Sequence, residues 1–164
     1  QDALTHVYNA AEWLVGDIER LVVDADRLKL DGVEVEDTVH VLARHRHGLM
    51  ANYSLNQHQP ANEMSMTVIT DTAMLRWENH HHRYQIFDAS TSAWQMREFS
   101  PLERDELFIR QAASFIDAVE CGSRPLCDLY DGIKTLYANL ASLRSLDSRG
   151  WENVWSENAI VDAR

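Results

Sequence analysis

The sequence has 164 residues, of which 45% are hydrophobic, and its 26 acidic and 15 basic side chains give a formal net charge of -11. A chain of this length folds around a hydrophobic core without needing a metal or a disulfide framework, so we expect one domain over residues 1–164. No apolar run approaches the roughly 20 residues of a membrane-spanning helix, and lysine and arginine are too few and scattered for nucleic-acid phosphates. We therefore expect neither a membrane nor a nucleic acid as partner.

Residues 2–15 have the periodicity of an amphipathic helix. Gly16 follows as a residue suited to positive φ at a helix C-terminus. Asp2, His6, Asn9 and Trp13 fall on the polar side of this helix. The apolar face consists of Leu4, Val7, Tyr8, Ala11 and Val15.

From Ile18 to Phe99 the apolar pattern changes to a period of two, which is typical of β-strands. The short turns at Asp31-Gly32, His47-Gly48 and Asp71-Thr72 predict antiparallel neighbours, because a parallel pair needs a crossover of about a dozen residues. The strands are expected at residues 18–24, 37–46, 49–57, 63–70, 73–78, 83–88 and 93–99.

Two further helices are expected after the strands. Ser100-Pro101-Leu102-Glu103 has the N-cap, proline and capping-box glutamate of a helix start, and Gly122 ends that helix. A second helix starts at Asp128 and ends near Gly150, and the tail from Trp151 either adds an edge strand or packs. The predicted buried residues are Phe108, Ala112, Phe115, Ile116 and Val119 in the first helix and Ile133, Leu136, Tyr137, Leu140 and Leu143 in the second.

This order of elements predicts an α+β fold, with a mostly antiparallel open β-sheet that has helices packed on one face. The other face has too many large apolar residues for a surface open to water, so we expect it to be available for oligomerisation of identical chains. The apolar residues that suggest this are Tyr53, Leu55, Met64, Met66, Trp77 and Trp94.

Asp2 and His6 are the strongest candidates for catalysis. Their i, i+4 spacing brings a carboxylate and an imidazole about 5–6 Å apart on a helix. A neutral imidazole can take a proton from a hydroxyl group, while a neighbouring carboxylate orients it or holds a second hydroxyl. From spacing alone, an ordinary solvated i, i+4 pair is the simpler interpretation.

Several segments together resemble the C-terminal domain of the glucose-fructose oxidoreductase and inositol dehydrogenase (Gfo/Idh/MocA) family. Residues 2–16, with the sequence DALTHVYNAAEWLVG, resemble the helix that opens that domain. The later segments that resemble the family, in the same order over nearly all of residues 1–150, are Glu36-Asp37-Thr38, His47-Gly48-Leu49, VITDTAML at 68–75, FIDAVECGSRP at 115–125 and Asp131-Gly132.

The resemblance implies one half of an NAD- or NADP-dependent oxidoreductase that acts on a sugar, a cyclitol or a related polyol. In such enzymes an N-terminal Rossmann domain, absent from this chain, binds the dinucleotide, and the C-terminal domain supplies a catalytic Asp and His. By this resemblance His6 is the general base or acid, Asp2 positions the hydroxyl or the imidazole, and Asn9 stands where many members have an aspartate. From their position after the third strand, Asn56, Gln57 and His58 are further candidates for binding the polyol, although the same residues serve equally well as an ordinary loop.

The chain has no dinucleotide-binding motif of its own. Its glycines, at positions 16, 32, 48, 122, 132 and 150, do not form G-x-G-x-x-G. We therefore expect no cofactor to bind this chain alone and expect the chain alone to be inactive. Residue 1 is Gln rather than Met, and we expect a missing segment upstream.

Other polar residues have simpler interpretations. His45 and His47 alternate on one strand and His80-His81-His82 lies between two strands, but no cysteine or carboxylate has a convincing ligand spacing beside them, so we expect no metal. Glu36-Asp37 is interpreted as a solvated strand entry. Cys121 and Cys127 lack C-x-x-C spacing and are expected as free thiols in a reducing cytoplasm.

Two other functions stay open. One is a stand-alone, non-catalytic module that uses the sheet for self-association. The other is a cofactor-independent lyase or hydrolase that uses Asp2 and His6.

Overall fold

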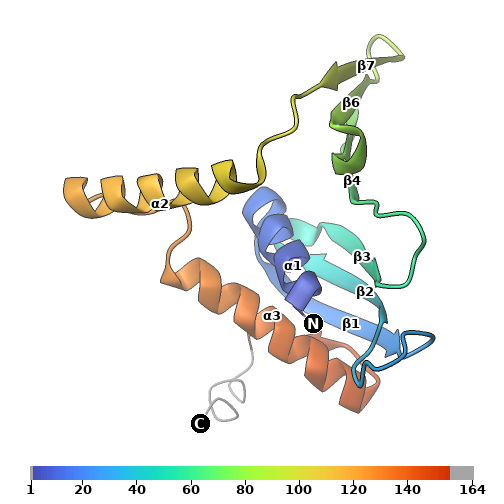
Figure 1. Cartoon of the computed structure of the whole chain (residues 1–164). Coiled ribbons are helices and arrows are strands. Elements are labelled where there is room, and N and C mark those ends of the chain that lie inside the picture. The colour runs from blue at the N-terminus through green and yellow to red at the C-terminus, as the bar shows by residue number, and fades with distance from the viewer. Residues whose placement is uncertain (1, 156–164) are drawn as a thin grey trace. The chain divides into compact units, whose positions relative to one another are not determined.

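The computed structural model describes residues 2–155, without the side chains of Asp2 and Arg104. The chain forms two compact units (Figure 1). Unit 1 comprises residues 1–58 and 124–164, and unit 2 comprises residues 59–123. The expected single domain over residues 1–164 stays a prediction. No helix in the described part of the chain is both long and apolar enough to span a membrane.

Unit 1 begins with helix α1 (Asp2–Val15), which has the predicted bounds. Gly16 ends it with φ +94°, a conformation that side chains with a Cβ rarely adopt. Leu4, Tyr8 and Ala11 are buried, and Val7 packs against the same core. The predicted apolar face of this helix is therefore confirmed.

The sheet of unit 1 is antiparallel, with strand order β3-β2-β1-β8. Its strands are β1 (Ile18–Asp26), β2 (Thr38–His45), β3 (Met50–Asn56) and β8 (Glu152–Asn153). A short 3-10 turn (Arg46–Gly48) joins β2 to β3. Of the two alternatives expected for the tail, the structure has the edge strand, β8, which pairs with β1.

Helix α3 (Leu129–Ser148) starts where the sequence predicts. Asp128 caps it, and Asp128 and Asp131 form a reciprocal capping box. The predicted buried stripe is wrong, since Leu136 and Leu143 are exposed. The buried face is made of small residues, which let α3 pack closely on α1 and β1: Thr135, Ala138, Ala141, Ser142 and Ser145.

Unit 2 contains a second antiparallel sheet, with strand order β4-β5-β6-β7. Every predicted strand of the chain lies within two residues of the observed bounds, but the strands form two sheets of four rather than one. The α+β class and the open antiparallel sheets are confirmed. The strands of unit 2 are β4 (Ser65–Ile69), β5 (Ala73–Glu78), β6 (Arg83–Asp88) and β7 (Ala93–Glu98).

The apolar residues that were expected on one sheet face are distributed over two units and over both faces of the second sheet. Tyr53 and Leu55 pack against the core of unit 1 and are not available to a partner. In unit 2, Met66 and Trp77 pair across β4 and β5 on one face, whereas Trp94 pairs with Phe87 on the other, with their rings tilted by 56°. Apolar residues of one sheet can lie on different faces because successive residues of a strand point to opposite faces.

Helix α2 (Arg104–Cys121) starts later than predicted. Ser100 does not cap it, and the residue before its first turn is Glu103, whose side chain makes no capping hydrogen bond. The backbone N–H of Phe99 still donates to the carbonyl of His82 at 2.8 Å, so the chain leaves the sheet only just before residue 100. Gly122 ends α2 with φ +64°, as predicted.

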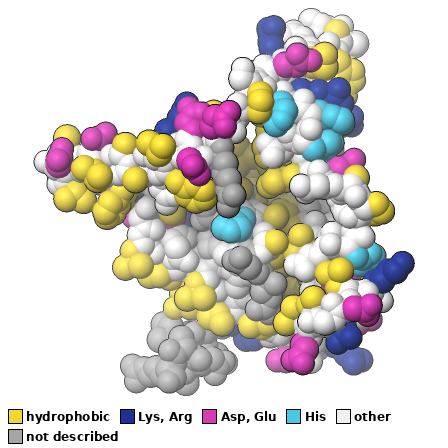
Figure 2. All heavy atoms as spheres, viewed as in Figure 1, with side chains coloured by type: hydrophobic (Ala, Val, Ile, Leu, Met, Phe, Trp, Pro, Cys, Tyr) yellow, Lys and Arg dark blue, Asp and Glu magenta, His cyan; other side chains and the backbone are white. Residues whose placement is uncertain are grey.

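The predicted buried stripe of α2 is exposed. Figure 2 shows hydrophobic side chains along this helix, and no described element packs extensively against it. Ala118 is the buried hydrophobic residue of α2. The exposed residues include Phe108, Phe115, Ile116 and Val119.

Candidate functional site

Helix α1 contacts α3 through side-chain hydrogen bonds. Asn9 Nδ2 donates to Thr135 Oγ1 at 3.1 Å, and Thr5 Oγ1 donates to Asn139 Oδ1 at 3.1 Å. The Tyr8 hydroxyl lies 2.8 Å from Ser142 Oγ, and burial raises the pKa of Tyr8 to about 12. These contacts fix the rotation of α1 against α3.

Glu12 is a buried carboxyl in this interface. Its Oε2 accepts a hydrogen bond from Thr135 Oγ1 at 3.2 Å, and its Oε1 lies 3.4 Å from the backbone nitrogen of Ile18. Burial raises the pKa of Glu12, although these hydrogen bonds and the Lys134 charge oppose the shift. A carboxyl with a raised pKa beside an open hollow is a candidate proton carrier.

Lys134 links α3 to the loop after α1. Its Nζ lies 3.0 Å from Asp17 Oδ1 and 3.1 Å from Asp131 Oδ1, and its side chain is 12% exposed. Burial alone would lower the pKa of Lys134, but the hydrogen bonds to Asp17 and Asp131 outweigh it and raise the pKa. Lys134 is therefore a fixed positive charge.

An open hollow lies between α1 and the start of α3 within unit 1. Its lining combines carboxyl groups, a cation, an amide and an aromatic ring. Trp13 contributes a ring that is 78% exposed. The lining residues are Asn9, Glu12, Trp13, Leu126, Cys127, Asp131 and Lys134.

His6 is an exposed residue of α1, one turn before Asn9. Because residues 6, 9 and 13 share one helical face, the imidazole continues the line of side chains that enters the hollow. The backbone of Asp2 begins α1, but its side chain lies outside the described residues. The expected contact between Asp2 and His6 stays a prediction.

Asn56 and His58 form a second group, at the start of β2. Asn56 Oδ1 accepts a hydrogen bond from the backbone of His58 at 3.0 Å, and His58 Nε2 lies 3.4 Å from Thr38 Oγ1. This group lies at one end of the sheet, where Thr38 pairs with Asn56. The C-terminal end of α1 lies at the other end, because Ile18, which follows α1, pairs with His45 there. Among the described residues, no hydrogen bond joins this group to Asn9.

Asp37 is not a solvated strand entry, and that interpretation is wrong. It is fully buried, and its carboxylate accepts hydrogen bonds from three consecutive backbone N–H groups, those of residues 28–30, and from Thr38 Oγ1. These hydrogen bonds, led by those from Leu30 and Lys29, lower the pKa of Asp37. The conformation of the loop, which the sequence does not reveal, makes this aspartate structural.

His45 is also structural rather than a metal ligand beside His47. Its Nδ1 lies 2.6 Å from the carbonyl oxygen of Gly16, and its Nε2 bonds the hydroxyl of Tyr53. Burial lowers the pKa of His45. The neutral ring therefore donates through Nδ1 and accepts through Nε2, which ties the end of α1 to the sheet.

The described residues do not fit a dinucleotide. All strand pairs between the described strands are antiparallel, so no parallel β-α-β unit with a glycine-rich turn is present among them to hold a pyrophosphate. One group of potential metal ligands, Glu78, His80 and His81, lies in unit 2. Cys121 and Cys127 are exposed and free.

Comparisons with known proteins agree with the geometry. Residues 1–76 match the model of the GFO/IDH/MocA C-terminal domain. Levoglucosan dehydrogenase, in a complex with NADH and levoglucosan, has 18% sequence identity and a TM-score of 0.84, over 94% of this chain and 50% of that one. The WlbA dehydrogenase from Bordetella pertussis, in complex with NADH and UDP-GlcNAcA, has 20% identity and a TM-score of 0.70, over 94% and 47%.

An oxidoreductase from Agrobacterium radiobacter, in complex with NAD+, L-tartaric acid and magnesium, has 16% identity and a TM-score of 0.81, over 92% of this chain and 47% of that one. The chain thus spans about half the length of the solved structures that it resembles. No curated protein matches the sequence. The predicted resemblance to this C-terminal domain is confirmed by the family match and the shared fold.

Proposed function

We propose that this chain, which has the fold of a Gfo/Idh/MocA C-terminal domain, is the substrate-binding half of an NAD- or NADP-dependent oxidoreductase acting on a sugar, a cyclitol or a related polyol. The observation that carries the proposal is the exposed imidazole of His6 on the same helical face as Asn9 and Trp13, which line the hollow. Proteins with this fold include dehydrogenases that bind NADH with a sugar or a sugar nucleotide.

In this proposal His6 takes the proton of the substrate hydroxyl as the alcohol is oxidised, and returns it in the reverse direction. Asp2, one turn earlier, orients the imidazole or holds a neighbouring hydroxyl. Asn9 is anchored through its Nδ2 on Thr135, which leaves the amide oxygen to accept a hydrogen bond from the substrate.

Asn56 and His58 are proposed as a second set of substrate-binding groups. Both are half-buried. The amide nitrogen of Asn56 remains to donate while its oxygen receives the backbone N–H of His58. An amide and an imidazole at the end of a sheet offer both donors and acceptors, which a polyol with several hydroxyl groups requires.

The cofactor is assigned to another part of the protein. Since the described residues form no dinucleotide site, the proposal requires a separate Rossmann domain that binds NAD or NADP, and this chain alone is inactive. The two free, exposed cysteines favour a reducing compartment, which we take to be the cytoplasm.

The experiment that tests the proposal replaces His6 by alanine in the longer protein that joins this chain to a dinucleotide-binding domain. Loss of the general base is expected to lower kcat about 100- to 10,000-fold with little change in KM. The measurement is NAD- and NADP-dependent oxidation across a set of sugars and cyclitols. His40→Ala, at an exposed histidine of β2, is the matched control and is expected to keep the wild-type rate.

The alternative is a non-catalytic module of the same fold that associates with itself. The exposed apolar stripe of α2 favours this function, because large apolar surfaces mark interaction sites. Unchanged alcohol oxidation in the His6→Ala protein would overturn the role of His6, whereas a wild-type protein that oxidises none of the sugars and cyclitols would leave the module as the better interpretation.

A further inference from the structure

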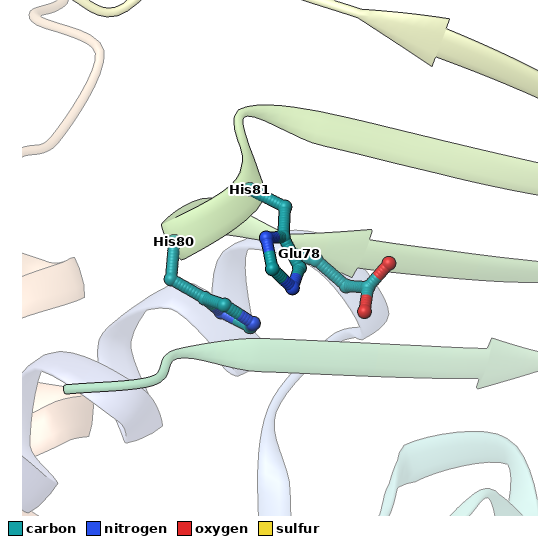
Figure 3. A group of neighbouring side chains, drawn as sticks. All are labelled: Glu78, His80 and His81. Atoms are coloured by element: carbon teal, nitrogen blue, oxygen red, sulfur yellow. The ribbon is translucent and has the colours of Figure 1, made fainter. Parts of the chain in front are cut away.

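The turn between β5 and β6 brings together three side chains with metal-binding atoms. Glu78 ends β5, His80 and His81 lie in the 3-10 turn Asn79–His81, and Arg83 begins β6. One ligand atom from each of Glu78, His80 and His81 lies within 4.8 Å of the others. Figure 3 shows the three side chains extending from this turn.

His80 has the surroundings of a metal ligand. Its Nδ1 lies 3.3 Å from the carbonyl oxygen of Met64, so donation from Nδ1 fixes the tautomer that leaves Nε2 with a free electron pair. Such a hydrogen bond to a backbone carbonyl is the usual support of a metal-bound histidine. The side chain is 17% exposed, and Glu63 Oε1 lies 4.0 Å from Nε2, which places a second carboxylate beside it.

Glu78 is held in position as an anion. Arg83 Nε and Gln85 Nε2 both donate to its Oε2, at 2.7 and 3.2 Å. The hydrogen bond from Arg83 lowers the pKa of Glu78. Among the described residues Oε1 receives no hydrogen bond, so one carboxylate oxygen is oriented by Arg83 and Gln85 while the other is available to an ion.

His81 completes the group with a ring 4.2 Å from that of His80, centroid to centroid. In a tetrahedral zinc site, ligand atoms about 2.0–2.1 Å from the ion lie about 3.3–3.4 Å from one another. Binding thus requires each pair of ligand atoms, now within 4.8 Å, to approach by at most about 1.5 Å. His81 is exposed and can rotate.

We propose that Glu78, His80 and His81 bind one divalent transition-metal ion, with zinc as the best fit to two imidazole nitrogens and one carboxylate oxygen. The expectation of no metal here overlooks Glu78, because its spacing of two residues from His80 is not one of the common ligand spacings of zinc sites. The tight turn supplies Glu78, which lies two residues before His80 but pairs with Arg83 at the base of the hairpin.

The test measures zinc binding to the chain by isothermal titration calorimetry after chelator treatment, with the visible absorption spectrum of bound cobalt as a second measurement. The wild type is expected to bind one ion. His80→Ala, His81→Ala and Glu78→Gln are each expected to weaken binding at least tenfold. Circular dichroism confirms that each variant is folded, and the exposed position of His81 makes its variant the safest.

His82→Asn is the matched control. His82 belongs to the same histidine run but packs beside Phe99, and asparagine tolerates its left-handed backbone with φ +49°. Binding within twofold of the wild type is expected. The proposal is overturned if the wild type binds no zinc, if His81→Ala binds as tightly as the wild type, or if His82→Asn weakens binding as much as His81→Ala does.

Discussion

At the residue scale, several buried or half-buried polar groups of unit 1 are held by more than one hydrogen bond. Asp37, His45 and Lys134 each have more than one polar partner within hydrogen-bond distance. A buried polar group that is left unpaired costs about 1–3 kcal/mol. Many of their partners are backbone groups, as for Asp37, or residues far along the chain, as Asp17 is for Lys134. A composition or spacing argument does not identify those partners.

Glu12 gives a prediction about pH. Because burial raises its pKa, the folded state holds a proton on Glu12 over a pH range in which the unfolded chain has lost it. The contribution of Glu12 to the free energy of unfolding therefore falls as pH rises from the ordinary glutamate pKa, about 4.3, to the raised value, and is constant above it.

Glu12→Gln is expected to remove this decline, because glutamine is never ionised. The measurement is urea unfolding at several pH values between about 4 and 7, and the quantity compared is the difference between variant and wild type. Other carboxylates, such as Asp88, have lowered pKa values and act in the opposite direction, but they cancel in that difference. Glu19→Gln, at an exposed position of β1, is the control. A difference that does not vary with pH would contradict the prediction.

At the element scale, the sequence predicts the bounds of a helix well where two independent signals, such as an apolar face and a capping residue, agree. Helix α1 has both its apolar face and Gly16, and α3 has the Asp128–Asp131 capping box. For α2 the sequence offers Ser100, Pro101 and Glu103, but the structure starts the helix at Arg104. A cap contributes only about 1 kcal/mol, which the continuation of the sheet to Phe99 overrides.

The cap of α3 provides a prediction at this scale. Asp128→Ala removes the hydrogen bond from Asp131 N, at 3.1 Å, and the ion pair with Arg124. We expect a loss of about 1 kcal/mol in the free energy of unfolding, measured by urea denaturation followed by helical circular dichroism. Asp128→Asn keeps an oxygen acceptor and is expected to lose less than half as much.

Asp147→Ala is the control for charge, since it removes one exposed carboxylate from the other end of the same helix. It is expected to change the free energy of unfolding by less than about 0.5 kcal/mol. If Asp128→Ala and Asp147→Ala are equally stable, the capping interpretation is wrong.

At the scale of the whole molecule, we propose that the chain self-associates through one sheet face of unit 2. The strand register places six apolar residues on that face, together with Asp88 and Arg97. The other face has the charged residues Arg76, Glu78 and Arg83 beside Phe87 and Trp94. Ile86 is 38% exposed there. The six residues are Met66, Val68, Leu75, Trp77, Tyr84 and Ile86.

Ile86→Glu is expected to turn an oligomer into a monomer, because a charge on an apolar contact surface must lose its hydration when the surface is buried. Light scattering at tens of micromolar measures the mass. Thr67→Glu, an exposed position on the opposite face, is the control and keeps the oligomer. A wild-type chain that is monomeric under these conditions would refute self-association.

The sequence by itself determined the order, type and approximate bounds of the strands, the first and last helices, and the family resemblance, because periodicity and turn residues act locally. It also placed His6 and Asn9 on one helical face. Tertiary structure decided the division into two sheets, the burial of Asp37 and His45, and the small-residue face of α3. These depend on contacts between residues whose proximity results from folding, and one-dimensional spacing does not contain that information.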